Sequence, residues 1–397
     1  MNADFSGGRN GAIDMLRGMT MFLMVAVNEF WTVLDVPHWL CHTETYEDGM
    51  GLSDIVFPMF LFAMGMSIPY AVERRYAKGL SGESTLGHII SRSFALLVMG
   101  VFTVNGGSNF APVLGYSRAV YYLIMLLGFF LIWNQYPKDF RWKKGLVALG
   151  AACLVFLALT YRTKDGGLLH ASWWGILGLI GWAYLFCAVL YVFCRKRLST
   201  LPLVWLSLVV VNAVTNGLRD GSTLIAPDNI ITNFAGALHL GEGSGPLMAM
   251  GGMLLSLCDR SLRSRPGWQR VALGLTVAFA FLSLGFLSHR WWIISKNLGT
   301  LPWCFYVTAL SVALYTLLRL LEEHGITRWF APFRPAGTAT LTVYMMPYIF
   351  LVLWIVVSPS IPEWLSGWVG VLKCALFSLL CIWMAQLFVK MGVKLKI

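Results

Sequence analysis

The sequence has little charge. Only 12% of its 397 residues are Asp, Glu, Lys or Arg, whereas 57% are hydrophobic, and the mean hydropathy is +0.68. A typical soluble domain carries about twice that share of charged residues. The composition therefore excludes an ordinary soluble protein. No polar stretch is long enough for a separate soluble domain, so we predict a single transmembrane domain over residues 1–397.

Several familiar signatures are also missing. The chain has no internal repeat, no low-complexity tract and no phosphate-cradling glycine motif, which argues against a P-loop nucleotide enzyme. Its eight cysteines show neither metal-ligand spacing nor a disulfide framework, and most lie in apolar runs, where cysteine acts as a small hydrophobic residue. Cys41 stands beside His42, but an oxidising exterior disfavours a thiol nucleophile there. We expect no metal.

What is present is a series of apolar runs of near-bilayer length. They predict an all-α, polytopic transmembrane helical bundle of about 10–12 spans. Twelve runs start near residues 13, 53, 88, 118, 144, 172, 200, 244, 270, 301, 336 and 366. The eighth, GPLMAMGGMLLSLC, is short for a full crossing, so it either extends backward through Ala235 or forms a half-helix.

The net charge of +11 orients the chain rather than indicating a nucleic-acid partner. If the N-terminus is cytoplasmic, 22 of the 30 Lys and Arg residues fall on the inner side and 6 on the outer side, with Arg92 and Lys373 inside spans. This is the distribution that the positive-inside rule describes. We therefore predict cytoplasmic termini, membrane lipid as the surroundings, no nucleic-acid partner, and an outer position for the segment from Asn28 to Asp54.

The first residues carry Asp4 and Asp14 and lack a small-residue cleavage site, so we expect the first apolar run to be retained. The compact chain without a long leader favours a bacterial-type inner (plasma) membrane. The oligomeric state is open, with a homodimer as one arrangement.

Three polar residues stand out in this otherwise apolar region: Asn28 at the end of the first run, His42 in the following loop, and Asp54 at the start of the second run. Polar groups at membrane depth are costly and usually mark a pathway or a reaction site. We therefore expect these three side chains to form a reaction site at one face of the bilayer.

The order of the motifs resembles the heparan-α-glucosaminide N-acetyltransferase family, which are transmembrane acetyl-CoA:amino-sugar acetyltransferases. That family has an S-x-D-x-x-R-G start, a helix ending in Val-Asn, a loop histidine and a G-L-x-x-A-D-L-V-F-P motif. The corresponding stretches here read AIDMLRG, VN at Asn28, His42 and GLSDIVFP. RSFALLVMGVF and ISKNLGTLPWCFYVTALSVALYTLL resemble later family segments, so the resemblance covers much of the chain.

The resemblance implies transfer of an acetyl group from cytoplasmic acetyl-CoA to the amine of an amino sugar at the outer (periplasmic) face. His42 would receive the acetyl group or remove a proton from the amine, and both mechanisms stay open. A loop histidine without a role is the plain alternative, and His38 competes for the same position. Asn28 suits an oxyanion donor, or else an interhelical hydrogen bond. Asp54 would hold the His42 tautomer or cap its helix, and a structural role is favoured.

Asp14 and Arg17 lie three residues apart on one helical face, which predicts a salt bridge. Alternatively, Arg17 and Arg92 bind the phosphates of coenzyme A. Further candidates for acceptor contacts lie in outer loops: Lys296, Asn297, His239 and Glu242. For the last two, a solvated loop is the simpler interpretation. Trp173, Trp174, Trp291 and Trp292 are interpreted as interface anchors near span ends.

Two features depart from the family pattern and concern the acceptor more than the fold. The loop from His42 to Gly51 is longer than in lysosomal members, and Gly299 replaces the usual tryptophan. The rival function is a multi-span transporter of a sugar or related small solute, since about twelve spans with both ends inside is a common transporter layout. Against it, the two halves lack matching Gly/Pro-interrupted segments. A third alternative, an assembly or interaction protein without catalytic activity, would not explain why Asn28, His42 and Asp54 occur together in this apolar region.

Overall fold

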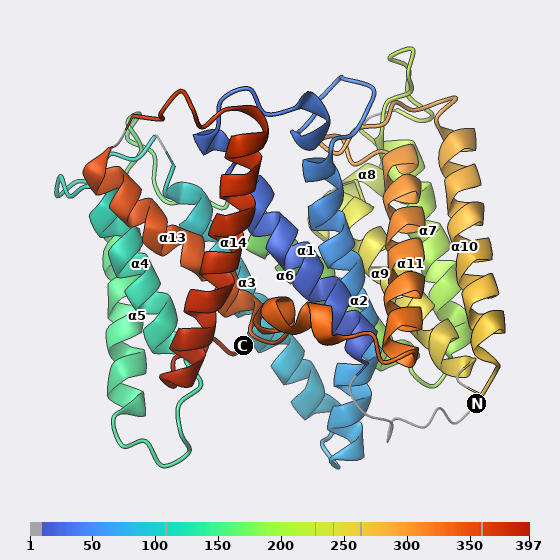
Figure 1. Ribbon diagram of the computed structural model, residues 1–397, viewed down its shortest axis with the longest axis horizontal. Helices are drawn as coiled ribbons and strands as arrows, with labels where there is room; N and C mark the ends of the chain where they lie inside the picture. The colour runs from blue at the N-terminus through green and yellow to red at the C-terminus, as the bar shows by residue number, and fades with distance from the viewer. Residues whose placement is uncertain (1–9, 108, 227, 241, 263, 359) are drawn as a thin grey trace.

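Helices account for the regular structure in the described part of the chain, which comprises residues 10–107, 109–226, 228–240, 242–262, 264–358 and 360–397 of a computed structural model (Figure 1). The α-helices there are α1 (Gly11–Val27), α2 (Leu52–Ala77), α3 (Gly82–Asn105), α4 (Arg118–Trp133), α5 (Lys143–Thr160), α6 (Gly175–Cys194), α7 (Leu201–Thr215), α8 (Ile230–Ala237), α9 (Ser244–Ser261), α10 (Gly267–Ser288), α11 (Leu301–Glu323), α12 (Arg334–Thr338), α13 (Thr340–Val357) and α14 (Gly367–Lys390). Short 3-10 turns are η1 (Phe30–Thr32), η2 (His38–Leu40), η3 (Leu198–Thr200) and η4 (Arg328–Phe333).

The expected all-α transmembrane bundle is confirmed. Each of the twelve expected starts lies within six residues of a helix start. In the described ranges, nine helices are long and apolar enough to cross a membrane, and α4 is a shorter apolar helix. The eighth run does not extend back through Ala235 as one helix, because α9 begins directly after Gly243, whose φ of +78° is left-handed.

Local sequence sets several helix starts. The side chain of Asn10 accepts a hydrogen bond from the backbone N–H of Ile13 at the start of α1 (3.2 Å), and Ser81 does the same for Ser84 at the start of α3 (3.1 Å). These side chains satisfy backbone donors that have no partner within the helix. The apolar runs that follow then extend the helices.

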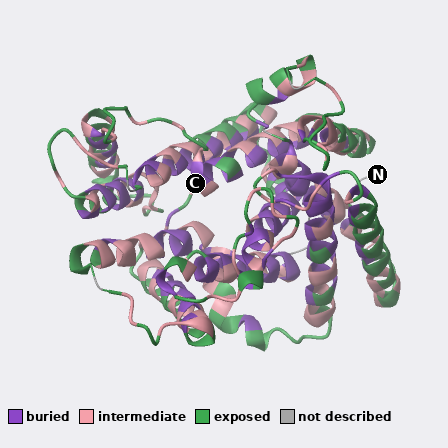
Figure 2. Ribbon diagram, turned by 90° about the horizontal axis from the view of Figure 1, so that it is seen from above, coloured by how far each residue is buried: buried purple, intermediate pink, exposed green. Residues whose placement is uncertain are grey.

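Helix α2 is central and α5, α7 and α10 are peripheral. In α2, 72% of the most apolar 18-residue stretch is buried within the protein, compared with 17% in α5, 17% in the continuous segment of η3 and α7, and 22% in α10. Figure 2 shows buried residues on the helix faces that meet inside the bundle and exposed residues along the outer helices. The outward faces are themselves apolar, as is typical of helices that contact lipid.

Glycines allow α2 and α9 to approach closely. A Cβ atom on Gly65 would lie 1.7 Å from the carbonyl oxygen of Ala249, and one on Gly252 would lie 2.0 Å from that of Phe62. Small residues at such positions permit the close backbone packing common in membrane bundles. This contact joins the two helices that carry part of the candidate site.

The loops of the candidate site gather at one end of the bundle. The segments that follow α1, α7 and α10 all lie at the upper end in Figure 1, whereas α1 begins and α14 ends toward the lower end. The start of α2, where Asp54 lies, is at that same upper end. The candidate reaction site therefore lies at the end of the bundle opposite the start of α1 and the end of α14.

Candidate active site

His42 and Asp54 are in direct contact. His42 lies in the extended segment between η2 and α2, and Asp54 is in the first turn of α2. The His42 Nδ1 atom is 2.7 Å from Asp54 Oδ1. The Asp54 side chain is 1% exposed, whereas that of His42 is 47% exposed. A buried carboxylate thus supports a half-exposed imidazole.

The other carboxylate oxygen of Asp54 also has donors. Its Oδ2 accepts hydrogen bonds from the backbone N–H groups of Thr43 and Gly51 and from the Thr43 hydroxyl, each at 3.0 Å. The bond from Gly51 caps α2, which is the structural role expected of Asp54 from the sequence. Such donors favour the ionised carboxylate and hold it in place.

The Asp54 contact assigns the tautomer of His42. A carboxylate accepts hydrogen bonds only, so Nδ1 must carry a proton and donate it. In the neutral imidazole, Nε2 then has a free lone pair. This is the arrangement in which a histidine acts as a base or nucleophile while a carboxylate orients it.

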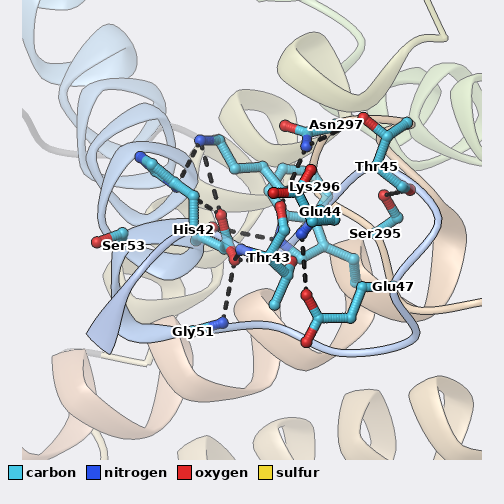
Figure 3. A network of polar contacts seen from close by, with 12 residues as sticks. His42, Thr43, Glu44, Thr45, Glu47, Gly51, Ser53, Ser295, Lys296 and Asn297 are labelled. Atoms are coloured by element: carbon cyan, nitrogen blue, oxygen red, sulfur yellow. Dashed lines mark hydrogen bonds and ion pairs between the residues drawn. The ribbon is translucent and has the colours of Figure 1, made fainter. Parts of the chain in front are cut away.

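Lys296 approaches the same pair from the loop between α10 and α11. Its Nζ atom lies 3.0 Å from His42 Nδ1 and 3.7 Å from Asp54 Oδ1 (Figure 3). Since the protonated Nδ1 has no lone pair to accept with, the ammonium interacts with Asp54 rather than hydrogen-bonding to the ring. Burial lowers the pKa of Lys296, and the negative charge of Asp54 opposes that shift.

Asp48 joins the site loops to one another. Its carboxylate contacts His289 Nε2 (2.8 Å), the Arg219 guanidinium (2.6 Å) and the backbone N–H of Ile294 (2.8 Å). Partial burial opposes ionisation of Asp48, but these donors outweigh it and hold its pKa below the usual range for an aspartate. Nearby, Asn297 Nδ2 donates to the Thr43 carbonyl at 3.3 Å. The longer loop after His42 is therefore held against the α10–α11 loop.

These loops and the upper ends of α1, α2, α6 and α9 enclose a cavity of about 810 Å³, which we name the His42 cavity. Its lining includes six of the residues selected from the sequence: Asn28, His42, His239, Glu242, Lys296 and Asn297. Asp54 lies behind His42. Aromatic residues supply much of the remaining wall, namely Trp173, Trp174, Trp182 and Trp303.

One wall of the His42 cavity is built by an aromatic stack. The His239 ring stacks on Trp182 with centroids 4.4 Å apart, and Trp174 meets His239 edge to face at 5.6 Å. His239 has a φ of +52°, so its backbone is in the left-handed region. Within the described ranges, the buried Trp182 Nε1 has no hydrogen-bond partner.

Arg17 and Arg92 line a different cavity, of about 410 Å³, which we name the Arg17 cavity. Lys394 and Lys396 of the C-terminal segment also line it. Arg17 forms the expected salt bridge with Asp14 at 2.6 Å and also donates to the Gly337 carbonyl. The Arg92 guanidinium lies 4.7 Å from the Tyr184 ring centroid. The two arginines therefore share one basic cavity.

The remaining candidates lie away from the imidazole. His38 does not line the His42 cavity; its Nε2 contacts Glu47 at 3.2 Å in an exposed pair. Cys41 is also absent from the lining, and burial, with a further contribution from Asp54, raises the pKa of its thiol. A raised pKa leaves the thiol protonated and weakly nucleophilic at neutral pH.

Several site residues were not anticipated from the sequence. Thr43 donates a hydrogen bond from its hydroxyl to the Asp54 carboxylate. The buried Asn212 of α7 donates to the carbonyls of Glu242 and Gly299, both at 2.7 Å. The interpretation of Trp292 as an interface anchor is wrong, because this side chain is buried and its Nε1 donates to the Asn216 carbonyl. A polar Asn212 inside an apolar run was the one available signal.

A metal would need a cluster of suitable ligands. Within the described ranges, no group of three or more His, Cys, Asp or Glu residues has the arrangement to hold a metal ion. The groups suited to an organic ligand are instead the polar lining of the His42 cavity and the four cationic side chains of the Arg17 cavity.

Comparison with known proteins gives two matches to curated relatives. The chain is 31% identical over 148 residues to heparan-alpha-glucosaminide N-acetyltransferase from Mus musculus, covering 34% of this chain and 21% of that protein. It is 32% identical over 106 residues to the Homo sapiens protein of the same name, covering 26% of this chain and 15% of that protein. The matched stretch thus spans about a fifth of these relatives or less, and the resemblance expected from the motifs is confirmed as a distant relationship.

A family model covers more of the chain. The model described as domain of unknown function DUF5009 matches residues 9–240, which include α1 to α8 and the whole segment from Asn28 to Asp54. The chain therefore belongs to the DUF5009 family and is distantly related to the heparan-α-glucosaminide N-acetyltransferases.

Proposed function

We propose that this protein is a transmembrane acetyltransferase that moves an acetyl group from acetyl-CoA to the amine of an amino sugar. The observation that carries the proposal is the His42–Asp54 pair at 2.7 Å, facing a cavity lined by Lys296, Asn28 and aromatic side chains. A histidine that is oriented by a buried carboxylate and half-exposed to a cavity is suited to acyl transfer. The names of the two relatives support the same reaction class.

Acetyl-CoA would bind with its phosphates in the Arg17 cavity. Arg17, Arg92, Lys394 and Lys396 provide positive charge for them. The inner-side excess of basic residues in the sequence supports a cytoplasmic position for this end. From here the thioester must reach the opposite end of the bundle.

The same three helices line both cavities on successive turns. On α1, Met21 lines the Arg17 cavity and Met24 lines the His42 cavity. On α2, Phe60 lines the Arg17 cavity and Phe57 lines the His42 cavity. On α6, Ile180 lines the Arg17 cavity and Ile176, one turn away, lines the His42 cavity. Arg17 and Asn28 are eleven residues apart along α1, about 16 Å at 1.5 Å per residue. That separation is comparable with the extended pantetheine arm of coenzyme A.

The acceptor would bind in the His42 cavity. Faces of Trp173 and Trp174 suit packing against a sugar ring. Glu242 offers a negative charge for the ammonium form of the amine. Asn28 and Lys296 are donors for the negative charge that develops on the thioester oxygen.

Two reaction sequences fit this arrangement. In direct transfer, the amine nitrogen attacks the thioester carbonyl, His42 Nε2 takes the amine proton, the carbon–sulfur bond breaks, and the CoA thiolate leaves and is protonated. In the covalent sequence, Nε2 attacks first and releases the CoA thiolate; the amine then attacks the acetyl-imidazole, with loss of its proton to solvent or to the freed imidazole. Both yield an amide and free CoA.

The proposal is tested with purified protein in lipid nanodiscs, by following release of the free CoA thiol. We expect release from acetyl-CoA only when glucosamine is added, with formation of N-acetylglucosamine in equal amount. Uptake of glucosamine into proteoliposomes without acetyl-CoA, and no thiol release, would instead support the transporter.

Labelled acetyl-CoA distinguishes the two sequences. Protein incubated without acceptor would retain label on His42 if the covalent sequence operates, and the label would leave on addition of glucosamine. An absence of label, combined with normal turnover when both substrates are present, would support direct transfer.

A further inference from the structure

A third cavity adjoins the His42 cavity. It has a volume of about 600 Å³ and is bounded by α1, η1, α3, α6, α13 and α14; we name it the Tyr348 cavity. Three residues line both cavities, namely Asn28, Trp173 and Ile176. The two spaces therefore adjoin along the side of α1 where Asn28 lies.

The two cavities differ in chemistry. The Tyr348 cavity is lined mainly by apolar and aromatic side chains, including Tyr348, Leu351 and Trp354 of α13 and Phe377 of α14. Among its described lining residues, the charged ones are Glu29 and Lys373, which pair with each other at 3.1 Å. The His42 cavity, by contrast, presents imidazole, ammonium, carboxylate and amide groups.

The Tyr348 cavity also borders the lipid-facing surface. Leu353 and Val357 line it and are 58% and 70% exposed, and both belong to α13, one of the helices long and apolar enough to cross a membrane. Trp31 of η1 lines the same space and packs edge to face on Trp354, with centroids 5.3 Å apart. An apolar chain in the membrane would reach this cavity without crossing water.

We propose that the acceptor is an amphiphilic amino sugar, whose sugar binds in the His42 cavity and whose apolar aglycone binds in the Tyr348 cavity. This inference rests on the proposed function and names the substrate class of that site. A polar cavity next to an apolar one that borders lipid matches the two ends of such a molecule. Asn28 and Trp173 lie where the sugar and the chain would join.

The test compares glucosamine with alkyl 2-amino-2-deoxyglucosides of increasing chain length, at monomeric concentrations, in nanodiscs. Each fully buried methylene is worth up to about fourfold in binding. We therefore expect kcat/KM for the octyl glucoside to exceed that for glucosamine by about tenfold or more, through a lower KM. Equal values at all chain lengths, with glucosamine itself acetylated, would overturn this inference and leave the acetyltransferase proposal intact.

A cavity-filling variant separates binding at this site from partition into lipid. Leu351→Trp should abolish the chain-length advantage while leaving kcat/KM for glucosamine within about twofold, which also reports that the variant is folded. The matched control is Val356→Trp, at an exposed position of the same helix outside the lining, where the advantage should persist. If Leu351→Trp keeps the full advantage, the chain binds elsewhere and the inference is overturned.

The same variant tests a rival occupant. Tyr344 lines both the Tyr348 and the Arg17 cavities, so the pantetheine arm of acetyl-CoA is the other candidate. A rise in the KM for acetyl-CoA with every acceptor would assign the cavity to the cofactor and overturn the inference. No thiol release with any amino sugar would overturn the proposed function, and the inference with it.

Discussion

His42 Nδ1 lies 2.7 Å from Asp54 Oδ1, and the other oxygen of that carboxylate is held by Thr43 and Gly51. The imidazole is thus oriented by a group that is itself fixed at the start of α2. This relationship gives His42 Nε2 a free lone pair at the His42 cavity, and it leads directly to the first prediction.

Replacing Asp54 with asparagine should reduce kcat by about 10-fold to 100-fold. The asparagine side chain has one acceptor oxygen, and its NH2 group would face groups that donate hydrogen bonds to the carboxylate in the wild type. His42 would therefore lose its fixed tautomer. Glucosamine-dependent thiol release measures the effect, with Asp48→Asn as the matched control because Asp48 holds the same loop without contacting His42. An Asp54→Asn variant with wild-type kcat would show that the carboxylate does not act through His42.

Lys296 should determine the alkaline limit of activity. The pKa of Lys296 is lowered, so as pH rises its ammonium group loses its proton at a lower pH than an ordinary lysine does. The interaction with Asp54 is lost with it. Since a guanidinium stays charged, Lys296→Arg should retain kcat at alkaline pH below the titration range of an ordinary lysine, where the wild type declines. Identical profiles at saturating glucosamine would rule out Lys296 as the titrating group.

Replacing Arg92 should weaken the binding of acetyl-CoA and leave the rate of the chemical step nearly unchanged. Loss of one charge-assisted hydrogen bond to a phosphate costs about 1.5–3 kcal/mol, so Arg92→Gln should raise the KM for acetyl-CoA about 10-fold or more and change kcat less than twofold. Arg74→Gln is the control, because Arg74 is a basic residue of α2 outside the Arg17 cavity. An unchanged KM in Arg92→Gln would place the phosphates elsewhere.

The α2–α9 contact should be sensitive to a single methyl group. Gly65→Ala puts a Cβ atom 1.7 Å from the Ala249 carbonyl oxygen unless the helices separate, at a cost of about 1–3 kcal/mol. The unfolding temperature in detergent should therefore fall by several degrees. Gly87→Ala on α3, where a Cβ meets nothing within 4 Å, should leave it unchanged or raised. An unchanged unfolding temperature in Gly65→Ala would mean that α2 and α9 separate readily.

Much of the fold was predictable, because hydrophobic length alone locates membrane helices. The starts of the twelve runs located α1 to α7, α9 to α11, α13 and α14 to within six residues. The break before α9 could not be predicted, since it depends on the left-handed turn at Gly243. Short α8 was not expected as a separate helix, and the run that starts near residue 336 is divided between α12 and α13. Length and composition carry no information on such local turns.

The candidate site was predictable where its residues are close in sequence. Asn28, His42 and Asp54 flank one loop, so the contact of His42 with Asp54 and the place of Asn28 at the same cavity could be inferred from the chain order. The approach of Lys296, the stack of His239 on Trp182 and the bonds from Asn212 join segments far apart in sequence. Those contacts depend on helix packing that no local pattern specifies.

The most direct measurement compares His42→Ala with His38→Ala in the glucosamine-dependent thiol-release assay. General acid–base catalysis by a positioned side chain contributes about 10²- to 10⁴-fold, so His42→Ala should lose at least about 100-fold in kcat. His38, exposed and paired with Glu47 outside the cavity, should tolerate alanine with activity within about twofold. Near-normal turnover in His42→Ala would contradict the account.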